Sequence, residues 1–150
     1  MKKLLKNIQR ELKKIEGVKY VDTNWGQLDY YSPNFPVLWP CVLIDITDAQ
    51  FSNIGINKKT IPRNRQQATA QISLTVANLQ LTNSSGMATA KQQENAIKIW
   101  DIIAEVHKTL HGFRPDEKTG VMIRESMQRV IRDDGVQEYK ITYSIVLHDV

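Results

Sequence analysis

The carboxy-terminal stretch, residues 121–148, constrains this chain more than any other, because it has the pattern of a two-stranded β-ribbon. Its second half alternates between two faces: Tyr139, Ile141, Tyr143, Ile145 and Leu147 on one, and Lys140, Thr142, Ser144 and His148 on the other. Successive side chains of a strand point to opposite faces, so the pattern predicts one buried face and one wet face. Asp134-Gly135 between the two halves predicts a tight hairpin turn, and a parity shift near residues 124–128 predicts a bulge or an exposed edge. The apolar face needs a cover from elsewhere in the chain.

Two amphipathic segments are predicted to supply that cover as helices. In residues 2–16, apolar side chains recur at spacings of three and four, and Gly17 follows as a stop signal. Residues 91–111 have a broader apolar face, which Thr89 can cap at its start and Gly112 ends. The apolar positions of the first segment are Leu5, Ile8, Leu12 and Ile15, and those of the second include Ile97, Trp100, Ile103, Ala104, His107 and Leu110.

Three further segments are predicted as strands. Residues 18–23 alternate weakly, residues 41–48 begin with the fully apolar run Cys41-Val42-Leu43-Ile44, and residues 68–76 alternate clearly with a Gln, Ser and Thr face. The connection 49–66 is polar and basic, and is predicted to be an extended loop or a protruding hairpin. The sequence therefore predicts a single α+β domain over residues 1–150, with a largely antiparallel sheet of about four to five strands packed against two helices and ending in a β-hairpin.

Residues 24–40 concentrate aromatic side chains in a stretch broken by prolines, which exclude a helix or a central strand there. The rings are Trp25, Tyr30, Tyr31, Phe35 and Trp39. Aromatic side chains cover core edges and are also enriched in interface hot spots. Two interpretations stay open at this point, a lid on the core and a contact between subunits.

The charge of the chain is unevenly distributed. The formal net charge is only +4, but no acidic residue lies between Asp48 and Glu94. Lys58, Lys59, Arg63, Arg65 and Lys91 lie in that interval. Such a segment can face a polyanion or an acidic partner surface, or it can be a solvated loop.

No catalytic, metal or cofactor constellation is expected. Asp45 and Asp48 lie at an odd spacing in a predicted strand, so they are expected on opposite faces. His107 and His111 lack a third ligand and are expected at the edge of the core. The single cysteine, Cys41, sits in an apolar run and is interpreted as a small buried hydrophobe in a reducing compartment.

The amino terminus lacks a signal-peptide apolar core, and no apolar run reaches the roughly 18 residues of a membrane span. We therefore expect a protein that is cytoplasmic where it is made and has no membrane partner.

The order of these elements resembles the tail terminator proteins of long-tailed bacteriophages and prophages. The resemblance runs through nearly the whole chain, at Ile15-Glu16-Gly17-Val18-Lys19-Tyr20-Val21, Trp25-Gly26-Gln27-Leu28-Asp29, Trp39-Pro40-Cys41-Val42-Leu43-Ile44, Val106-His107-Lys108-Thr109-Leu110-His111-Gly112-Phe113 and the ribbon 124–143. The family is divergent, and its relatives among head completion and tail tube proteins share similar architecture.

This resemblance implies a structural protein without enzyme activity or cofactor, which assembles as a ring, typically a hexamer, on the end of the tail tube. Such a ring stops tube growth and presents a surface to the head-tail connector protein, and DNA later passes through its lumen. The implied location is the virion tail, after assembly in the host cytoplasm. As hypotheses, Trp25, Tyr30, Tyr31 and Phe35 contribute to the subunit interface, and Lys58, Lys59, Arg63 and Arg65 line the lumen or contact the tail tube.

Two alternatives remain. Another phage neck, head-completion or baseplate component fits the sequence equally well. A protein of a different class, a nucleic-acid-binding module, would combine the basic segment with aromatic side chains as stacking platforms.

Overall fold

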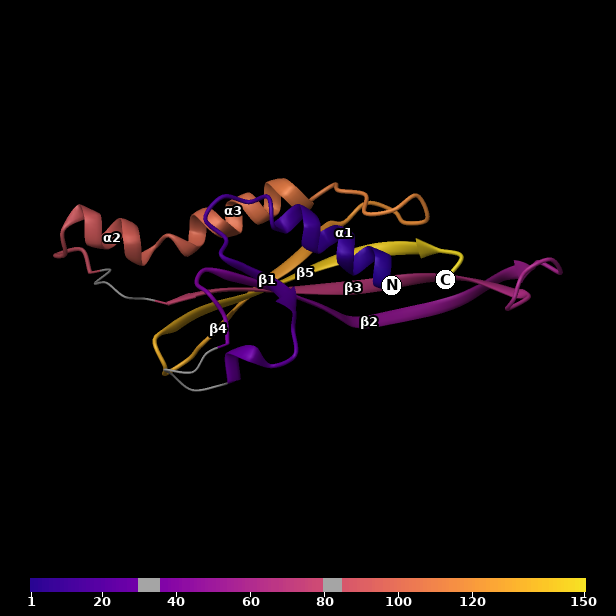
Figure 1. Ribbon diagram of the computed structural model, residues 1–150, viewed down its shortest axis with the longest axis horizontal. Coiled ribbons are helices and arrows are strands. Elements are labelled where there is room, and N and C mark those ends of the chain that lie inside the picture. Colours follow the sequence, from indigo (N-terminus) through magenta and orange to yellow (C-terminus); the bar gives the residue numbers. More distant parts are fainter. Residues whose placement is uncertain (30–35, 80–84) are drawn as a thin grey trace.

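The computed structural model describes residues 1–29, 36–79 and 85–150, and Figure 1 shows helices on one face of a single twisted sheet. The elements are α1 (Lys2–Leu12), β1 (Tyr20–Thr23), the short 3-10 helix η1 (Gln27–Asp29), β2 (Cys41–Ile56), β3 (Asn64–Leu79), α2 (Ala90–Ala96), α3 (Ile99–Leu110), β4 (Ile123–Val130) and β5 (Val136–His148). The five strands lie in the order β1-β2-β3-β5-β4, and only the β1–β2 pair is parallel. The predicted α+β class with a largely antiparallel sheet is confirmed.

The main core lies between the sheet and the pair α1 and α3. Leu4, Ile8 and Leu12 of α1 and Ile99, Ile102, Ile103, Val106 and Leu110 of α3 pack on the apolar face of β2, β3 and β5. That face includes Ile72, Leu74, Ile141 and Tyr143, all fully buried. The alternation predicted for the last strand and for residues 68–76 is thus the pattern of the helix-covered face.

A second, smaller core lies under the opposite face of the sheet. Leu28 and Val37 cover Cys41, Leu43 and Ala77 there. The run 41–44 is buried on both faces as predicted, because helices cover one side and the segment around η1 covers the other. Cys41 is free and fully buried, and burial raises the pKa of its thiol to about 12, which agrees with its interpretation as a hydrophobe.

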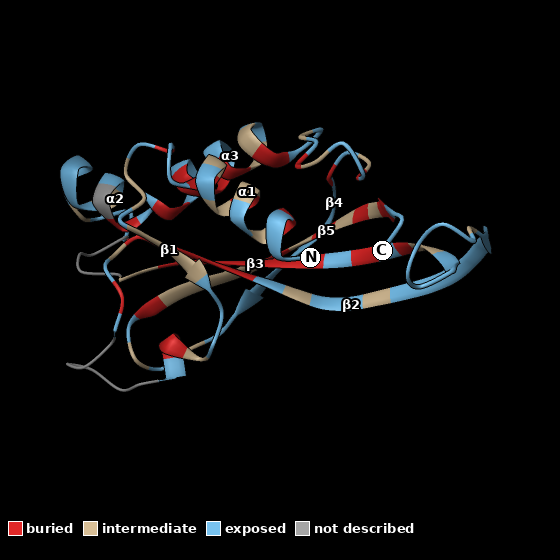
Figure 2. Cartoon of the chain, turned by 45° about the vertical axis from the view of Figure 1, so that its right-hand side comes forward, coloured by how far each residue is buried: buried red, intermediate tan, exposed pale blue. Residues whose placement is uncertain are grey.

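β2 and β3 form a hairpin that projects beyond every other strand (Figures 1 and 2). β5 ends opposite Gln67, whereas the β2–β3 pairing continues to Ile56 and Asn64. The hairpin alternative for residues 49–66 is therefore confirmed, and the end predicted for the strand at residue 48 is wrong. The distal part of the hairpin is largely exposed on both faces, and a register shift between Asn53 and Gly55 interrupts the apolar positions Phe51, Ile54 and Ile56, so the sequence there has no continuous alternation.

The long helix predicted for residues 91–111 is interrupted. α2 ends at Ala96, and α3 begins at Ile99 after a tighter turn in which the Trp100 amide bonds to the Ile97 carbonyl. Ile97 and Trp100, predicted for the buried face, are exposed, and so is Ala104. The predicted cap is confirmed, since the Thr89 hydroxyl accepts a hydrogen bond from the Gln92 amide at 3.3 Å.

The turn of the carboxy-terminal ribbon is wider than predicted. β4 ends at Val130 and β5 begins at Val136, and only Gly135 in this turn has a positive φ, of 78°. Within the turn, the Arg132 guanidinium donates hydrogen bonds to the Asp134 carboxylate. The bulge expected near residues 124–128 is confirmed between Arg124 and Ser126.

Candidate interaction surfaces

The end of the β2–β3 hairpin is a basic turn held by its own hydrogen bonds. The Asn57 amide donates to the Arg63 carbonyl at 2.7 Å, and the Thr60 hydroxyl lies 3.2 Å from the carbonyls of Asn57 and Pro62. These bonds define the shape of residues 57–63, which carry exposed Lys58, Lys59 and Arg63. We call this turn, with the flanking Ile54 and Ile56, the hairpin end.

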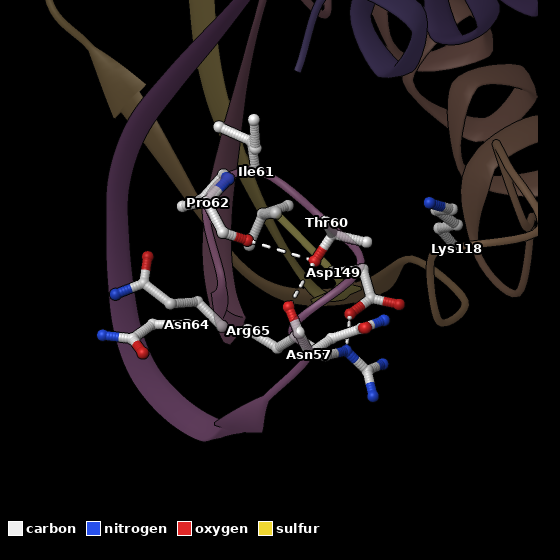
Figure 3. Close-up of a pocket in the computed structure, with 10 residues that line it drawn as sticks. Asn57, Thr60, Ile61, Pro62, Asn64, Arg65, Lys118 and Asp149 are labelled. Atoms are coloured by element: carbon white, nitrogen blue, oxygen red, sulfur yellow. Dashed lines mark hydrogen bonds and ion pairs between the residues drawn. The ribbon is translucent and has the colours of Figure 1, made fainter.

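Arg65, the fourth predicted cation of this segment, is set apart from the other three. Its Nε lies 2.6 Å from the Asp149 carboxylate, which lowers the pKa of Asp149 below its ordinary value. Figure 3 shows this pair on one side of an open recess of about 450 Å³, with Lys118 facing it from the other side. The structure therefore keeps Lys58, Lys59 and Arg63 together, and uses Arg65 to hold the end of the chain against the hairpin.

The hairpin end also exposes apolar side chains. Ile61 is fully exposed at its tip, and Ile56 and Ile54 are 71% and 45% exposed. Phe51, nearer the body of the molecule, is 52% exposed. Single exposed apolar side chains are ordinary, but a group of them on a projecting hairpin is typical of a contact surface.

At the other end of the molecule, Gln27 and Arg132 fix the segment that contains η1. The fully buried Gln27 side chain donates to the Thr23 carbonyl at 2.8 Å and accepts from the Trp25 amide at 2.9 Å. Arg132 reaches from the β4–β5 turn to the Leu28 carbonyl and pairs with Asp134 at 2.6 Å and Glu138 at 2.9 Å. Arg132 is not among the residues predicted from the sequence, because nothing local shows that an arginine beside Asp133 and Asp134 turns inward.

The predicted aromatic contacts divide between the two interpretations. Trp39 packs against the smaller core, which supports a lid, whereas Trp25 is 53% exposed. Tyr30, Tyr31 and Phe35 lie outside the described residues, so their predicted role in a subunit interface remains a prediction.

Beside η1, the β4–β5 turn encloses an open recess lined by Asp29, Val130, Ile131, Arg132, Asp133 and Asp134. Among the described residues, Asp29 and Asp133 form no ion pair, while Asp134 is held by Arg132. Arg132 lowers the pKa of Asp134, so this carboxylate stays charged at neutral pH. Ile131 is 84% exposed on the same turn. We call this site the acidic recess.

Both edges of the sheet are open over part of their length. β1 pairs only with residues 41–44 of β2, so no described strand covers the rest of that edge. On the other side, every residue of β4 is exposed, including Ile123, Met127 and Val130. Edge strands present unpaired backbone groups and can pair with another chain.

The prediction that Asp45 and Asp48 point to opposite faces is wrong. A bulge between Ile46 and Asp48 shifts the register, so Asp45 pairs with Ser73 and Asp48 with Gln71. Since Ser73 and Gln71 are two positions apart on β3, both carboxylates lie on the face opposite the helices. Both are exposed, and the described residues contain no group of three His, Cys, Asp or Glu side chains arranged for a metal ion.

His107 and His111 lie side by side at the end of α3, with ring centroids 4.8 Å apart. His111 Nδ1 accepts a hydrogen bond from the Arg124 amide at 3.2 Å, and the buried His107 Nδ1 has no partner among the described residues. Burial lowers the pKa of His107, and the nearby charges of Arg124 and His111 lower it further. The pair belongs to the core edge, as predicted.

A pH dependence of stability follows from His107. Its pKa in the folded protein lies below the ordinary value of 6.5, so the unfolded chain takes up the proton first as the pH falls. The contribution of His107 to the free energy of unfolding is fully present above about pH 6.5, and it is lost as the pH falls through the lowered pKa of His107. We expect the melting temperature to fall between about pH 7 and pH 5, and His107→Gln to flatten that slope.

The control for this experiment is His148→Gln, because His148 is exposed. The carboxylates with lowered pKa titrate below about 3.8 and leave this window free; they are Asp22, Asp116, Asp134 and Asp149. A slope that survives in His107→Gln and disappears in His148→Gln would contradict the assignment.

Comparison with known proteins gives a structural match only. No protein-family model matches the sequence, and no curated protein matches it. Among solved structures, the fold is similar to a chain of the "virion of native gene transfer agent (GTA) particle", with a TM-score of 0.58 and 10% sequence identity. The alignment covers 97% of this chain and 94% of that chain. At this identity the match establishes a shared fold over nearly the full length of both chains.

The helices in the described part of the chain are too short or too polar to cross a membrane.

Proposed function

We propose that this chain is a structural component of a phage-type particle, and specifically a tail terminator that forms a ring on the end of the tail tube. The observation that carries the proposal is the end-to-end similarity of fold to a chain of a gene transfer agent virion. It supports the class of virion structural protein that the sequence resemblance implies. The finer role, a terminator of tube growth that joins tail to head, comes from that resemblance.

The surfaces of the molecule support a role in assembly. Two open sheet edges, an exposed apolar hairpin end and an acidic recess are features that a chain covers by association. We propose that the partners are further copies in a ring of six, the tail tube protein and the head-tail connector protein, with DNA passing transiently through the lumen. In this proposal the protein carries out no catalysis, binds no cofactor, and belongs to the virion tail.

Tail length in the phage or prophage that encodes the chain tests this function. Deletion of the gene is expected to yield overlong tubes without heads in electron micrographs, and supplying the protein is expected to restore joined tails of uniform length. Tails of normal length joined to heads in its absence would overturn the terminator role. Tubes that are absent altogether would indicate a baseplate component instead.

A nucleic-acid-binding module is less well supported. It needs aromatic stacking platforms beside the basic surface. In the structure, Arg132 joins η1, which follows Trp25 closely in the chain, to the β4–β5 turn, while the basic hairpin end lies at the far end of the long axis (Figure 1). Among the described residues, the turn 57–63 carries no aromatic side chain to stack on a base.

A further inference from the structure

We propose that the hairpin end of one copy of this chain docks in the acidic recess of a second copy, so that the molecules associate head to tail. The inference rests on the proposed ring and names the surfaces that close it. Under this inference, Lys58, Lys59 and Arg63 contact a neighbouring subunit, whereas the sequence-based hypothesis places them in the lumen or against the tail tube.

The charges of the two surfaces are complementary. The hairpin end carries three cations that form no ion pair among the described residues, and no acidic residue lies near them in sequence. The acidic recess has three carboxylates against one guanidinium, and two of the carboxylates, Asp29 and Asp133, are exposed and unpaired within the described chain. Complementary potentials guide association and fix its register.

The apolar side chains of the two surfaces match as well. Ile61 stands fully exposed between the cations of the hairpin end, and Ile131 stands 84% exposed beside the carboxylates of the recess. An apolar centre with a charged rim is the usual composition of a protein interface.

The placement of the surfaces makes the contact head to tail. Figure 1 shows the hairpin end at one end of the long axis and the β4–β5 turn well away from it, toward the end where α2 lies. A chain therefore cannot bring its own two surfaces together, and each copy offers one surface to each neighbour. Such heterologous contacts produce a ring when the rotation between copies closes.

Charge reversal tests the contact on the full chain in solution, by light scattering at about 0.1 M salt, where charges are screened beyond about 10 Å. One variant carries Lys58→Glu, Lys59→Glu and Arg63→Glu, and a second carries Asp29→Lys and Asp133→Lys. Each variant alone is expected to be a monomer at concentrations where the natural chain is a ring. The chain with all five substitutions, and an equimolar mixture of the two variants, are expected to recover the ring.

The matched control reverses three exposed lysines elsewhere, Lys2 and Lys6 of α1 and Lys91 of α2. It is expected to keep the ring, and circular-dichroism spectra like that of the natural chain, with a cooperative thermal transition, show that every variant folds. A natural chain that stays monomeric at every concentration, reversed variants that still form rings, or reversals that fail to rescue each other would overturn the inference.

Tube capping separates this inference from the proposed function. A chain that assembles through these surfaces but leaves tubes uncapped overturns the function alone. A chain that caps tubes with either surface reversed overturns the inference alone.

Discussion

Replacing Arg132 with leucine is expected to lower the free energy of unfolding by about 1.5–3 kcal/mol, the contribution of hydrogen bonds to charged groups, because the cluster is only partly buried. The side chains of Arg132, Asp134 and Glu138 are only 16%, 11% and 13% exposed. Without the guanidinium, both carboxylates stay in this sheltered turn with no counter-charge, and the Leu28 carbonyl loses its donor. Urea unfolding followed by tryptophan fluorescence measures the loss.

The matched control is Lys108→Leu. It removes the ion pair between Lys108 and Glu105, which has a similar N–O distance of 2.6 Å but lies on an exposed helix face. Exposed pairs contribute little, so this variant is expected to unfold like the natural chain. Arg132→Lys is expected to fall between the two, because an ammonium keeps the charge but cannot hold three acceptors with a planar fork. If Arg132→Leu lowers the free energy of unfolding no more than the control does, the bonds of Arg132 do not stabilise the turn.

The cost of Arg132→Leu is also expected to depend on pH, in a direction set by Asp134. Arg132 holds the pKa of Asp134 below its ordinary value of 3.8, so the pair contributes stability above that pH. This contribution is lost as the pH falls through the lowered pKa of Asp134. The difference between the natural chain and Arg132→Leu should therefore shrink in strongly acidic solution.

The sequence predicted the parts of the fold in which burial imposes a pattern. Residues 68–76 and the last strand alternate because the helices pack on their apolar face, although Ser73 and Thr75 on the other face of β3 are buried too. Cys41-Val42-Leu43-Ile44 is apolar throughout because both of its faces are covered. The stripe on α1 was readable for the same reason, since Ile8 and Leu12 are fully buried. Wherever the structure buries a regular face, the side chains show its period.

Prediction was wrong where solvent surrounds an element on all sides. The outer halves of β2 and β3 are held by backbone pairing to each other, which leaves the side chains free of any periodic requirement. The described side chains of α2 are mostly exposed, with Ala96 buried at its end, so the sequence pattern did not mark where α2 ends and α3 begins. The bulge at Thr47 reversed the face of Asp48, because a single extra residue changes the parity of everything beyond it.

The sequence predicts which charged residues cluster along the chain, but it does not predict which distant residues the fold brings together at a surface. The cluster of Lys58, Lys59 and Arg63 is visible in the sequence, whereas the pairing of Arg65 with Asp149 joins residues far apart in the chain. The acidic recess could not be predicted, because Asp29 and Asp133 are far apart in the chain and line one recess only in the folded structure, where Arg132 joins η1 to the β4–β5 turn.

Replacing Tyr143 with alanine is expected to lower the free energy of unfolding by about 3–5 kcal/mol, the usual cost of deleting a buried aromatic ring. Tyr143 is fully buried on the helix-covered face of β5, where it pairs with Ile72 of β3 and Arg124 of β4. β5 lies between β3 and β4, so a cavity here weakens the packing under both helices.

Tyr143→Phe is expected to have the opposite sign and raise the free energy of unfolding by about 1 kcal/mol, because it removes a buried hydroxyl that lacks a partner. No described residue bonds to this hydroxyl, and burial raises its pKa to about 12. Tyr143→Phe keeps the aromatic side chain and Tyr143→Ala deletes it. The difference between their free energies of unfolding in urea therefore separates the effect of packing from that of the hydroxyl. A loss of stability in Tyr143→Phe would mean that the hydroxyl is bonded in solution, and the core under α1 and α3 would then contain a polar contact in addition to its apolar packing.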